Sequence, residues 1–123
     1  METFQDDEFM EMSWNGSAVV TRWKKLCLSY EERLAALVIL MAKHEGSRWI
    51  DDTTGTGCYF AAYTGWLRDV LLPPLVAAGL KRFAFIMPNY FGEAQLELTE
   101  KELGVDGLTV KAFNMQAPAG DWV

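Results

Sequence analysis

The chain has few of the residues from which metal and thiol sites are built. Its 123 residues contain one histidine and two cysteines. Cys27 and Cys58 form no C-x-x-C pair, and the single His44 does not complete the ligand set of a zinc site. We therefore expect free thiols in a reducing compartment and no bound metal.

Basic residues and long apolar runs are scarce as well. Eleven Lys and Arg stand against seventeen Asp and Glu, for a net charge of −6, which disfavours nucleic acid as a partner. The longest apolar run, from Leu34 to Ala42, is far shorter than a membrane span. Because the first residues, Glu2 to Glu8, are acidic and unlike a signal peptide, we expect a cytoplasmic protein with no membrane span.

Apolar and aromatic side chains, by contrast, are plentiful. Half of the chain is hydrophobic (50%) and 13% is aromatic. This is enough to fill the core of one domain over residues 1–123.

A β-hairpin is predicted near the start of the chain. Residues 8–14 alternate between apolar and polar, and Asn15-Gly16 is the dipeptide that favours a two-residue type I′ turn. With that turn, Trp14 would face Ser17 and Met12 would face Val19. The predicted core face comprises Met10, Met12, Trp14, Val19 and Trp23.

The first helix is predicted to begin at a capping box. In Ser29-Tyr30-Glu31-Glu32, the Ser29 hydroxyl can accept a hydrogen bond from a helical N–H while Glu32 reaches back. One apolar stripe follows at helical spacing, formed by Tyr30, Leu34, Leu37, Val38 and Met41. Gly46 is predicted to end this helix, and His44 to interact with the dipole at its C-terminus.

We take the stretch from Arg48 to Gly57 as the functional centre of the chain. A short apolar run, Trp49-Ile50, leads into two carboxylates, three hydroxyls and two glycines, as where a buried strand ends in a polar loop. Loops at strand ends often carry function. The candidate regulatory or partner-binding loop comprises Asp51, Asp52, Thr53, Thr54 and Thr56.

The second half of the chain predicts further helices and strands. A helical stripe of Tyr59, Tyr63, Trp66, Leu67 and Val70 runs into Pro73-Pro74, which predicts a kinked or broken helix. Residues 82–87 read as a central strand covered on both faces, residues 93–103 as a weaker helix and residues 108–113 as the last strand. Trp122 is expected to hold a short helix in the tail.

This order predicts an α/β fold: a hairpin followed by alternating helices and strands, with helices packed on a five-stranded mixed sheet. The pattern resembles the small bacterial STAS/SEC14-like (SpoIIAA-like) domain proteins. The resembling segments are Trp23, Trp49-Ile50-Asp51-Asp52-Thr53, Trp66-x6-Pro73-x5-Gly79-Leu80-Lys81-Arg82, Phe113 and Trp122. The resemblance covers most of the chain and implies a five-stranded sheet in a group largely of unassigned function.

The resemblance also implies a candidate switch. Anti-sigma-factor antagonists of the wider STAS group carry Asp-Ser-Ser-Gly-Leu-Gly around a phosphorylated serine, and this chain reads Asp52-Thr53-Thr54-Gly55-Thr56-Gly57. Thr54 occupies the matching position, although here the motif follows the strand without a spacer. The alternative is that Thr54 or Thr56 caps the next helix. At a helix N-terminus, Glu in place of Thr54 should be tolerated or mildly stabilising.

Signals of catalysis are weak. Gly55-Thr56-Gly57 is too short for a dinucleotide fingerprint or a P-loop, so no cofactor is expected. Asp51 and Asp52 are neighbours on a strand and point to opposite faces, so they cannot form an acid–base pair. Nothing places His44 beside Cys58 as the base for a thiol nucleophile. We do not expect an enzyme.

Three hypotheses follow. The first is a non-enzymatic regulatory or protein-interaction domain that docks through residues 51–59. The second is a carrier or sensor of a small apolar ligand, for which the candidate ligand or interface residues are Tyr59, Tyr63, Trp66, Phe91 and Trp122. The third is an enzyme, with only scattered candidate residues. With Phe60 added, these aromatics look too numerous for one small core, which predicts a homodimer.

Overall fold

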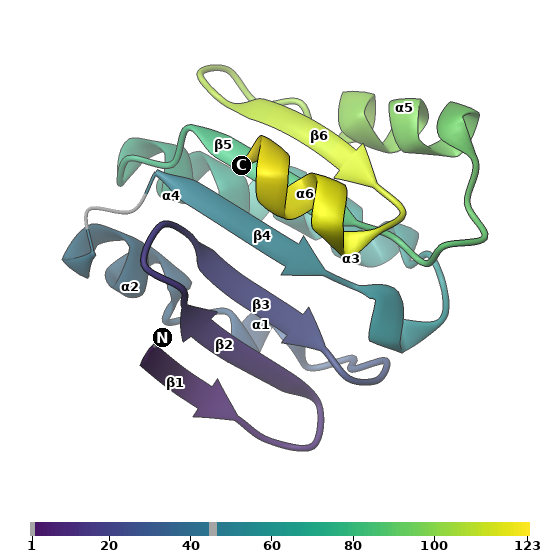
Figure 1. Ribbon diagram of the computed structural model, residues 1–123. Coiled ribbons are helices and arrows are strands. Elements are labelled where there is room, and N and C mark those ends of the chain that lie inside the picture. Colours follow the sequence, from purple (N-terminus) through teal and green to yellow (C-terminus); the bar gives the residue numbers. More distant parts are fainter. Residues whose placement is uncertain (1, 45–46) are drawn as a thin grey trace.

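The computed structural model describes residues 2–44 and 47–123, apart from the side chain of Ala117. A mixed sheet of six strands forms its centre, and the strands follow one another in chain order (Figure 1). The strands are β1 (Glu2–Asp6), β2 (Met10–Trp14), β3 (Val19–Trp23), β4 (Arg48–Asp52), β5 (Arg82–Ile86) and β6 (Thr109–Phe113). Strands β1 to β3 pair antiparallel, and β3 to β6 pair parallel.

The expected α/β class and mixed sheet are therefore confirmed, but the expected number of five strands is wrong. The sixth strand is β1, which pairs along the free edge of β2. A tight turn makes this pairing possible, because the carboxylate of Asp7 accepts hydrogen bonds from the backbone N–H groups of Phe9 and Met10. The acidic opening segment had given no strand signal of its own.

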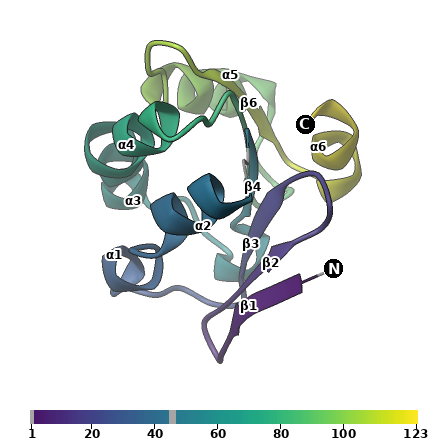
Figure 2. The same cartoon turned by 90° about the vertical axis from the view of Figure 1, so that its left-hand side faces the viewer.

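Helices cover both faces of the sheet, but unequally (Figure 2). One face carries α1 (Tyr30–Arg33), α2 (Leu37–Lys43), α3 (Ala61–Trp66), the π-helical turn η2 (Leu67–Leu71), α4 (Leu72–Ala77) and α5 (Glu93–Glu102). Only α6 (Gln116–Trp122), after the last strand, lies on the other face. Right-handed crossovers between parallel strands that follow one another in order place every intervening helix on the same side.

The hairpin pairs in a different register from the one expected. Trp14 faces Val19 and Met12 faces Thr21, so four residues rather than two connect the strands. The Asn15 side chain explains the longer turn, since its Oδ1 accepts from the N–H groups of Ser17 and Ala18. The shift is by two residues, which preserves the side-chain alternation, so the predicted core face is confirmed.

The predicted capping box does not form. Ser29 precedes α1 but makes no side-chain cap, and its hydroxyl lies 3.2 Å from the sulfur of Cys27. The expected single helix is divided into α1 and α2 by residues 34–36. The predicted stripe nevertheless packs on the sheet, with Leu34, Leu37 and Met41 fully buried. Gly46, the expected end of this helix, lies outside the described residues.

The proline pair does not break the following helix. Pro73 and Pro74 occupy the first turn of α4, where their missing N–H groups cost little. The preceding turn η2 is widened, and the N–H of Leu72 bonds to the carbonyl of Leu67, five residues back. Helices α3, η2 and α4 therefore follow without interruption, so the expected break is wrong, and a π-helical turn precedes the prolines.

The core has two parts, one on each face of the sheet. The larger part lies under the helices of the first face and includes Trp49, Leu34, Leu67, Leu75 and Phe83, all fully buried. The smaller part lies under α6 and consists of Ala18, Ile50, Ala84, Ile86, Phe113 and Ala119. Strand β5 is buried on both faces, as predicted.

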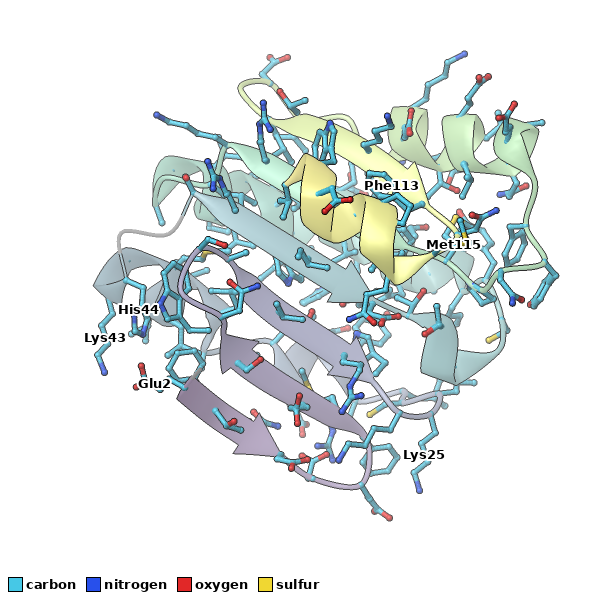
Figure 3. The ribbon with its side chains drawn as sticks, viewed as in Figure 1. Glu2, Lys25, Lys43, His44, Phe113 and Met115 are labelled. Atoms are coloured by element: carbon cyan, nitrogen blue, oxygen red, sulfur yellow. The ribbon has the colours of Figure 1, made fainter. Side chains whose placement is uncertain are left out.

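Trp122 holds the tail helix, α6, against the sheet, as the sequence predicted. The ring of Trp122 packs 5.9 Å from that of Phe113, and Figure 3 places Phe113 beneath α6. The Arg82 guanidinium lies 5.3 Å from the Trp122 ring, and its Nη1 donates to the Trp122 carbonyl at 2.8 Å. These contacts fasten α6 to β5 and β6.

Candidate functional site

The candidate site lies where the parallel strands end. Strands β3, β4, β5 and β6 run in the same direction, so the segments that follow Trp23, Asp52, Ile86 and Phe113 meet along one edge of the sheet (Figure 1). In open α/β sheets, ligands bind outside this carboxyl edge.

Asp51, near the end of β4, is the most unusual residue at this edge. It is 0% exposed, on the helix-covered face. Its Oδ1 accepts hydrogen bonds from the Thr21 hydroxyl at 2.6 Å and the Trp23 indole N–H at 3.0 Å. Its Oδ2 accepts from the Tyr63 hydroxyl at 2.6 Å. Thr21 in turn accepts from the indole N–H of Trp49 at 2.9 Å, so the network joins β3, β4 and α3.

Burial changes the acidity of both titratable groups in this network. Desolvation raises the pKa of Asp51 to about 7, although hydrogen bonds from Thr21, Tyr63 and Trp23 oppose the shift. Desolvation and the neighbouring Asp51 carboxylate raise the pKa of Tyr63 well above its ordinary value. Asp51 therefore changes charge near neutral pH inside a closed set of donors.

An aromatic pocket opens directly beside the Asp51 network. It is small, with a cavity volume of about 30 Å³, and it opens to solvent on one side. Its lining consists of Trp23, Leu26, Cys27, Tyr30, Thr53, Thr56, Cys58, Tyr59, Phe60, Tyr63, Phe85, Met87 and Pro88. No charged side chain is among these lining residues, although Trp23 and Tyr63 separate the pocket from the Asp51 carboxylate.

One wall of the pocket depends on a close backbone contact. The short 3₁₀ helix η1 (Thr54–Thr56) packs against the end of β3, and a Cβ on Gly55 would lie 2.1 Å from the carbonyl oxygen of Trp23. Glycine is required there by contact, not only by turn geometry. Thr53 donates to the carbonyl of Ile86 at 2.7 Å, which attaches the same wall to β5.

Asp52 and Thr54 form a separate unit. The Oδ1 of Asp52 accepts from both the N–H of Thr54 at 3.0 Å and its hydroxyl at 2.7 Å. Neither Thr54 nor Thr56 caps an α-helix, because η1 has three residues and α3 begins only at Ala61 after an uncapped Phe60. The expected cap role of these threonines is therefore wrong.

The predicted docking loop is only partly accessible. Asp51, Asp52 and Thr53 are buried, at 0%, 4% and 6% exposure. Thr54 is exposed and Thr56 half-buried. Thr54 borders a second, more open hollow that is also lined by Tyr90, Asn114 and Met115.

The predicted aromatic site residues divide into two groups. Tyr59 and Tyr63 line the pocket; Trp66 packs against Tyr63, and Phe91 packs against Tyr59. Trp122 is on the other face of the sheet and does not join them.

Sequence reasoning missed the far wall of the pocket. Trp23 is the last residue of β3, Cys27 and Tyr30 come from the segment that follows it, and Phe85 comes from β5. Trp23 at a strand end and Phe85 in an apolar run carried the available signals, but no local pattern showed that these residues share a cavity.

The contacts of His44 set it apart from the pocket and from the Asp51 network. Its ring stacks on Trp14 at 5.1 Å, and its Nε2 lies 3.7 Å from the Glu2 carboxylate, as the labelled side chains in Figure 3 indicate. It follows the last residue of α2, near the helix C-terminus as predicted.

Comparison with models of known protein families, with curated proteins and with solved structures finds no match to this chain. Within residues 2–44 and 47–123, no three His, Cys, Asp or Glu side chains are grouped so that they could hold a metal ion. None of the helices described has both the length and the apolar character needed to cross a membrane.

Proposed function

We propose that this protein is a non-enzymatic carrier or sensor that holds a small, largely apolar ligand in the aromatic pocket. The observation that supports this proposal is the pocket itself, which lies at the carboxyl edge of the sheet and is lined mainly by carbon and sulfur. Concave sites lined mainly by apolar and aromatic side chains are the usual form of a small-molecule site, and a ligand would have to widen this one as it enters.

The arrangement of polar groups supports binding rather than catalysis. The Asp51 carboxylate is turned toward Thr21, Trp23 and Tyr63, and these donors occupy its oxygens. A general base must approach the proton that it removes within hydrogen-bond distance. The rings of Trp23 and Tyr63 stand between Asp51 and the pocket.

Binding of small apolar compounds tests this proposal. Indole, toluene and 3,3-dimethyl-1-butanol are titrated into the protein, with the melting temperature and tryptophan fluorescence as readouts. Binding to the native state alone raises the melting temperature, and Trp23 reports from the pocket wall. At least one compound is expected to bind.

A pocket-filling variant locates the site. Cys58 lines the pocket, and a phenyl ring in place of its thiol would occupy the pocket. Cys58→Phe should therefore abolish binding. The control is Met115→Phe, which introduces the same phenyl ring at an exposed position outside the pocket. This variant should bind as the wild type does. Binding that survives Cys58→Phe, or no binding by these three compounds and by charged analogues of the same shape, would refute the proposal.

A regulatory docking role is the second candidate. It is favoured by one observation: exposed Thr54 lies beside exposed Tyr90 and Met115 around the second hollow. A phosphate on Thr54 would stand close to the Asp52 carboxylate, which now accepts the Thr54 hydroxyl, and would displace that contact. The resemblance to SpoIIAA-like domains stays part of this proposal.

Affinity capture with wild type, Thr54→Ala and Thr54→Glu tests the docking role. A partner that packs over Thr54 should be lost with Glu and retained with Ala, whereas one that presents an Arg should be captured better with Glu. Identical recovery of the same proteins by all three variants would leave Thr54 with a purely structural role.

A homodimer also stays a proposal, on a narrower basis. The six aromatics that motivated it are buried or half-buried in the single chain. The exposed apolar residues are instead Leu26, Leu28, Ile39, Val70, Tyr90, Leu98 and Met115. Sedimentation that shows only a 13.9 kDa species at high micromolar concentration would exclude it.

A further inference from the structure

The aromatic pocket has the form of a cage. Six of its lining residues are aromatic, namely Trp23, Tyr30, Tyr59, Phe60, Tyr63 and Phe85. Neighbouring rings stand nearly perpendicular: 80° between Trp23 and Tyr63, 72° between Tyr30 and Tyr63, and 80° between Tyr30 and Phe60. In each pair the edge of one ring meets the face of the other, with ring centroids 5.1 to 5.9 Å apart, so these rings pack on one another along the pocket lining.

Carboxylates lie behind three of these rings. Asp51 accepts the indole N–H of Trp23 at 3.0 Å and the hydroxyl of Tyr63 at 2.6 Å. Glu102, on α5, accepts the hydroxyl of Tyr59. A ring that donates its polar hydrogen to a carboxylate gains electron density, which makes its face more negative. The negative face of an aromatic ring attracts cations.

The nearby cationic side chains are paired elsewhere. Lys24 and Lys25, after β3, lie at 2.5 Å and 3.2 Å from the carboxylates of Asp6 and Glu8. Arg33 pairs with Asp7 and covers the ring of Phe9. The lining itself contains no Lys, Arg or His. An anionic ligand would therefore find no counter-charge in the pocket and would face Asp51 across two rings.

We propose that the pocket binds a small methylated ammonium cation, whose methyl groups contact the ring faces while its charge is attracted by the rings and by the carboxylates behind them. This assignment rests on the proposed function of the pocket and names its ligand class. A neutral apolar molecule of the same shape would gain the same burial but not the attraction of cation to ring.

Three compounds of one shape separate the alternatives. Choline carries the trimethylammonium group, 3,3-dimethyl-1-butanol replaces its nitrogen by carbon, and 3,3-dimethylbutyrate adds a negative charge instead. Calorimetric titration at about pH 8.5, where the Asp51 carboxylate is ionised, is expected to give choline an affinity at least about tenfold higher than the alcohol, as the attraction at a desolvated ring face allows. The butyrate should bind least.

Variants then test whether the carboxylates behind the rings matter. Asp51→Asn should remove most of the preference for choline over the alcohol. The control is Asp52→Asn, which also replaces a carboxylate by an amide but on the opposite face of the sheet. This variant should keep the preference for choline over the alcohol. Should Asp51→Asn fail to fold, Glu102→Gln tests the same idea at an exposed position, behind Tyr59.

The outcomes are distinguishable. Equal affinity for choline and the alcohol, or a stronger affinity for the butyrate, would overturn the cation assignment and leave the apolar pocket standing. Failure of all three compounds, together with indole and toluene, would overturn both. A preference for choline that is unchanged in both Asp51→Asn and Glu102→Gln would show that the carboxylates do not create it, and would overturn the proposed mechanism of selection.

Discussion

The two faces of the sheet place the same residue type in opposite settings. Asp51 and Asp52 are neighbours at the end of β4 and point to opposite faces. On the helix-covered face, Asp51 is enclosed by donors from β3 and α3. Toward the face with α6, Asp52 organises the exposed turn that begins at Thr54. One carboxylate is joined to the core and the pocket, and the other to a local turn.

The contrast between Asp51 and Asp52 indicates that the number of helices packed over a side chain, more than its residue type, determines its surroundings. The helix-covered face has several helices above it, whereas the other has α6 alone (Figure 2). Each prediction below changes one of these settings, in order of decreasing effect.

The largest difference is expected between the tryptophans of the two faces. Trp49 is 0% exposed, stacks on Phe83 at 4.4 Å and donates to Thr21, so Trp49→Ala should lower the free energy of unfolding by about 3–5 kcal/mol. Trp122 is half-buried on the other face, and Trp122→Ala should cost about 1 kcal/mol. Chemical denaturation measures the free energy of unfolding of both variants. Equal losses would contradict the claim that the two faces of the sheet are covered to different depths.

The second effect concerns pH. Burial raises the pKa of Asp51 from 3.8 to about 7, so the folded protein holds a proton that the unfolded chain releases. The stability from this group is complete below pH 4 and is lost as pH rises toward about 7. The free energy of unfolding of the wild type should fall by about 3–4 kcal/mol over this window relative to Asp51→Asn.

Denaturation of both proteins from pH 4 to pH 8 checks this prediction. The difference between the two curves isolates Asp51 from other carboxylates such as Asp7, whose pKa is lowered to about 2. A difference that does not vary with pH would mean that folding does not raise the pKa of Asp51 above its ordinary value.

The third effect concerns the turn between β2 and β3, whose register places side chains on the two faces. Gly16 has φ = 99°, and an added side chain there would meet no other atom within 4 Å. Gly16→Val should therefore destabilise by about 1–2 kcal/mol through backbone strain alone. Gly65, in α3, is also in open space, and Gly65→Ala should stabilise by about 0.5–1 kcal/mol. The same sign for both variants would refute the strain argument.

The smallest effect is expected at the exposed turn. The sequence predicted that Glu at Thr54 would be tolerated or mildly stabilising at a helix N-terminus. Because the Thr54 hydroxyl instead donates to the Asp52 carboxylate, Thr54→Glu should destabilise by about 0.5–1 kcal/mol through lost bonding and repulsion. Thermal unfolding at low and high salt measures it, and added salt should reduce the loss. If Thr54→Glu is more stable than the wild type, the prediction made from the sequence is correct and the argument from the Asp52 contact is wrong.

The pattern of the sequence was sufficient for most of the elements and for their buried sides, but it missed β1 and the division between α1 and α2. Apolar alternation predicted the core face of β2 and β3, helical spacing predicted the stripe of α1 and α2, and a continuous apolar run predicted the doubly covered β5. These signals are local, since each depends only on which side of one element must avoid water. Errors arose where a side chain had a choice of partners, as at Asn15, Ser29 and Thr54.

The sequence by itself determined the class of the fold and the position of the candidate site at the end of β4, because the residues at that strand end are adjacent in the chain. Tertiary structure alone decided that Asp51 is buried, that Gly55 touches the backbone of Trp23, and that aromatic residues from β3, α1, α3 and β5 share one pocket. The physical reason is distance along the chain. Trp23 and Tyr63 are bound to one carboxylate from positions 28 and 12 residues away, and no local periodicity records such a meeting.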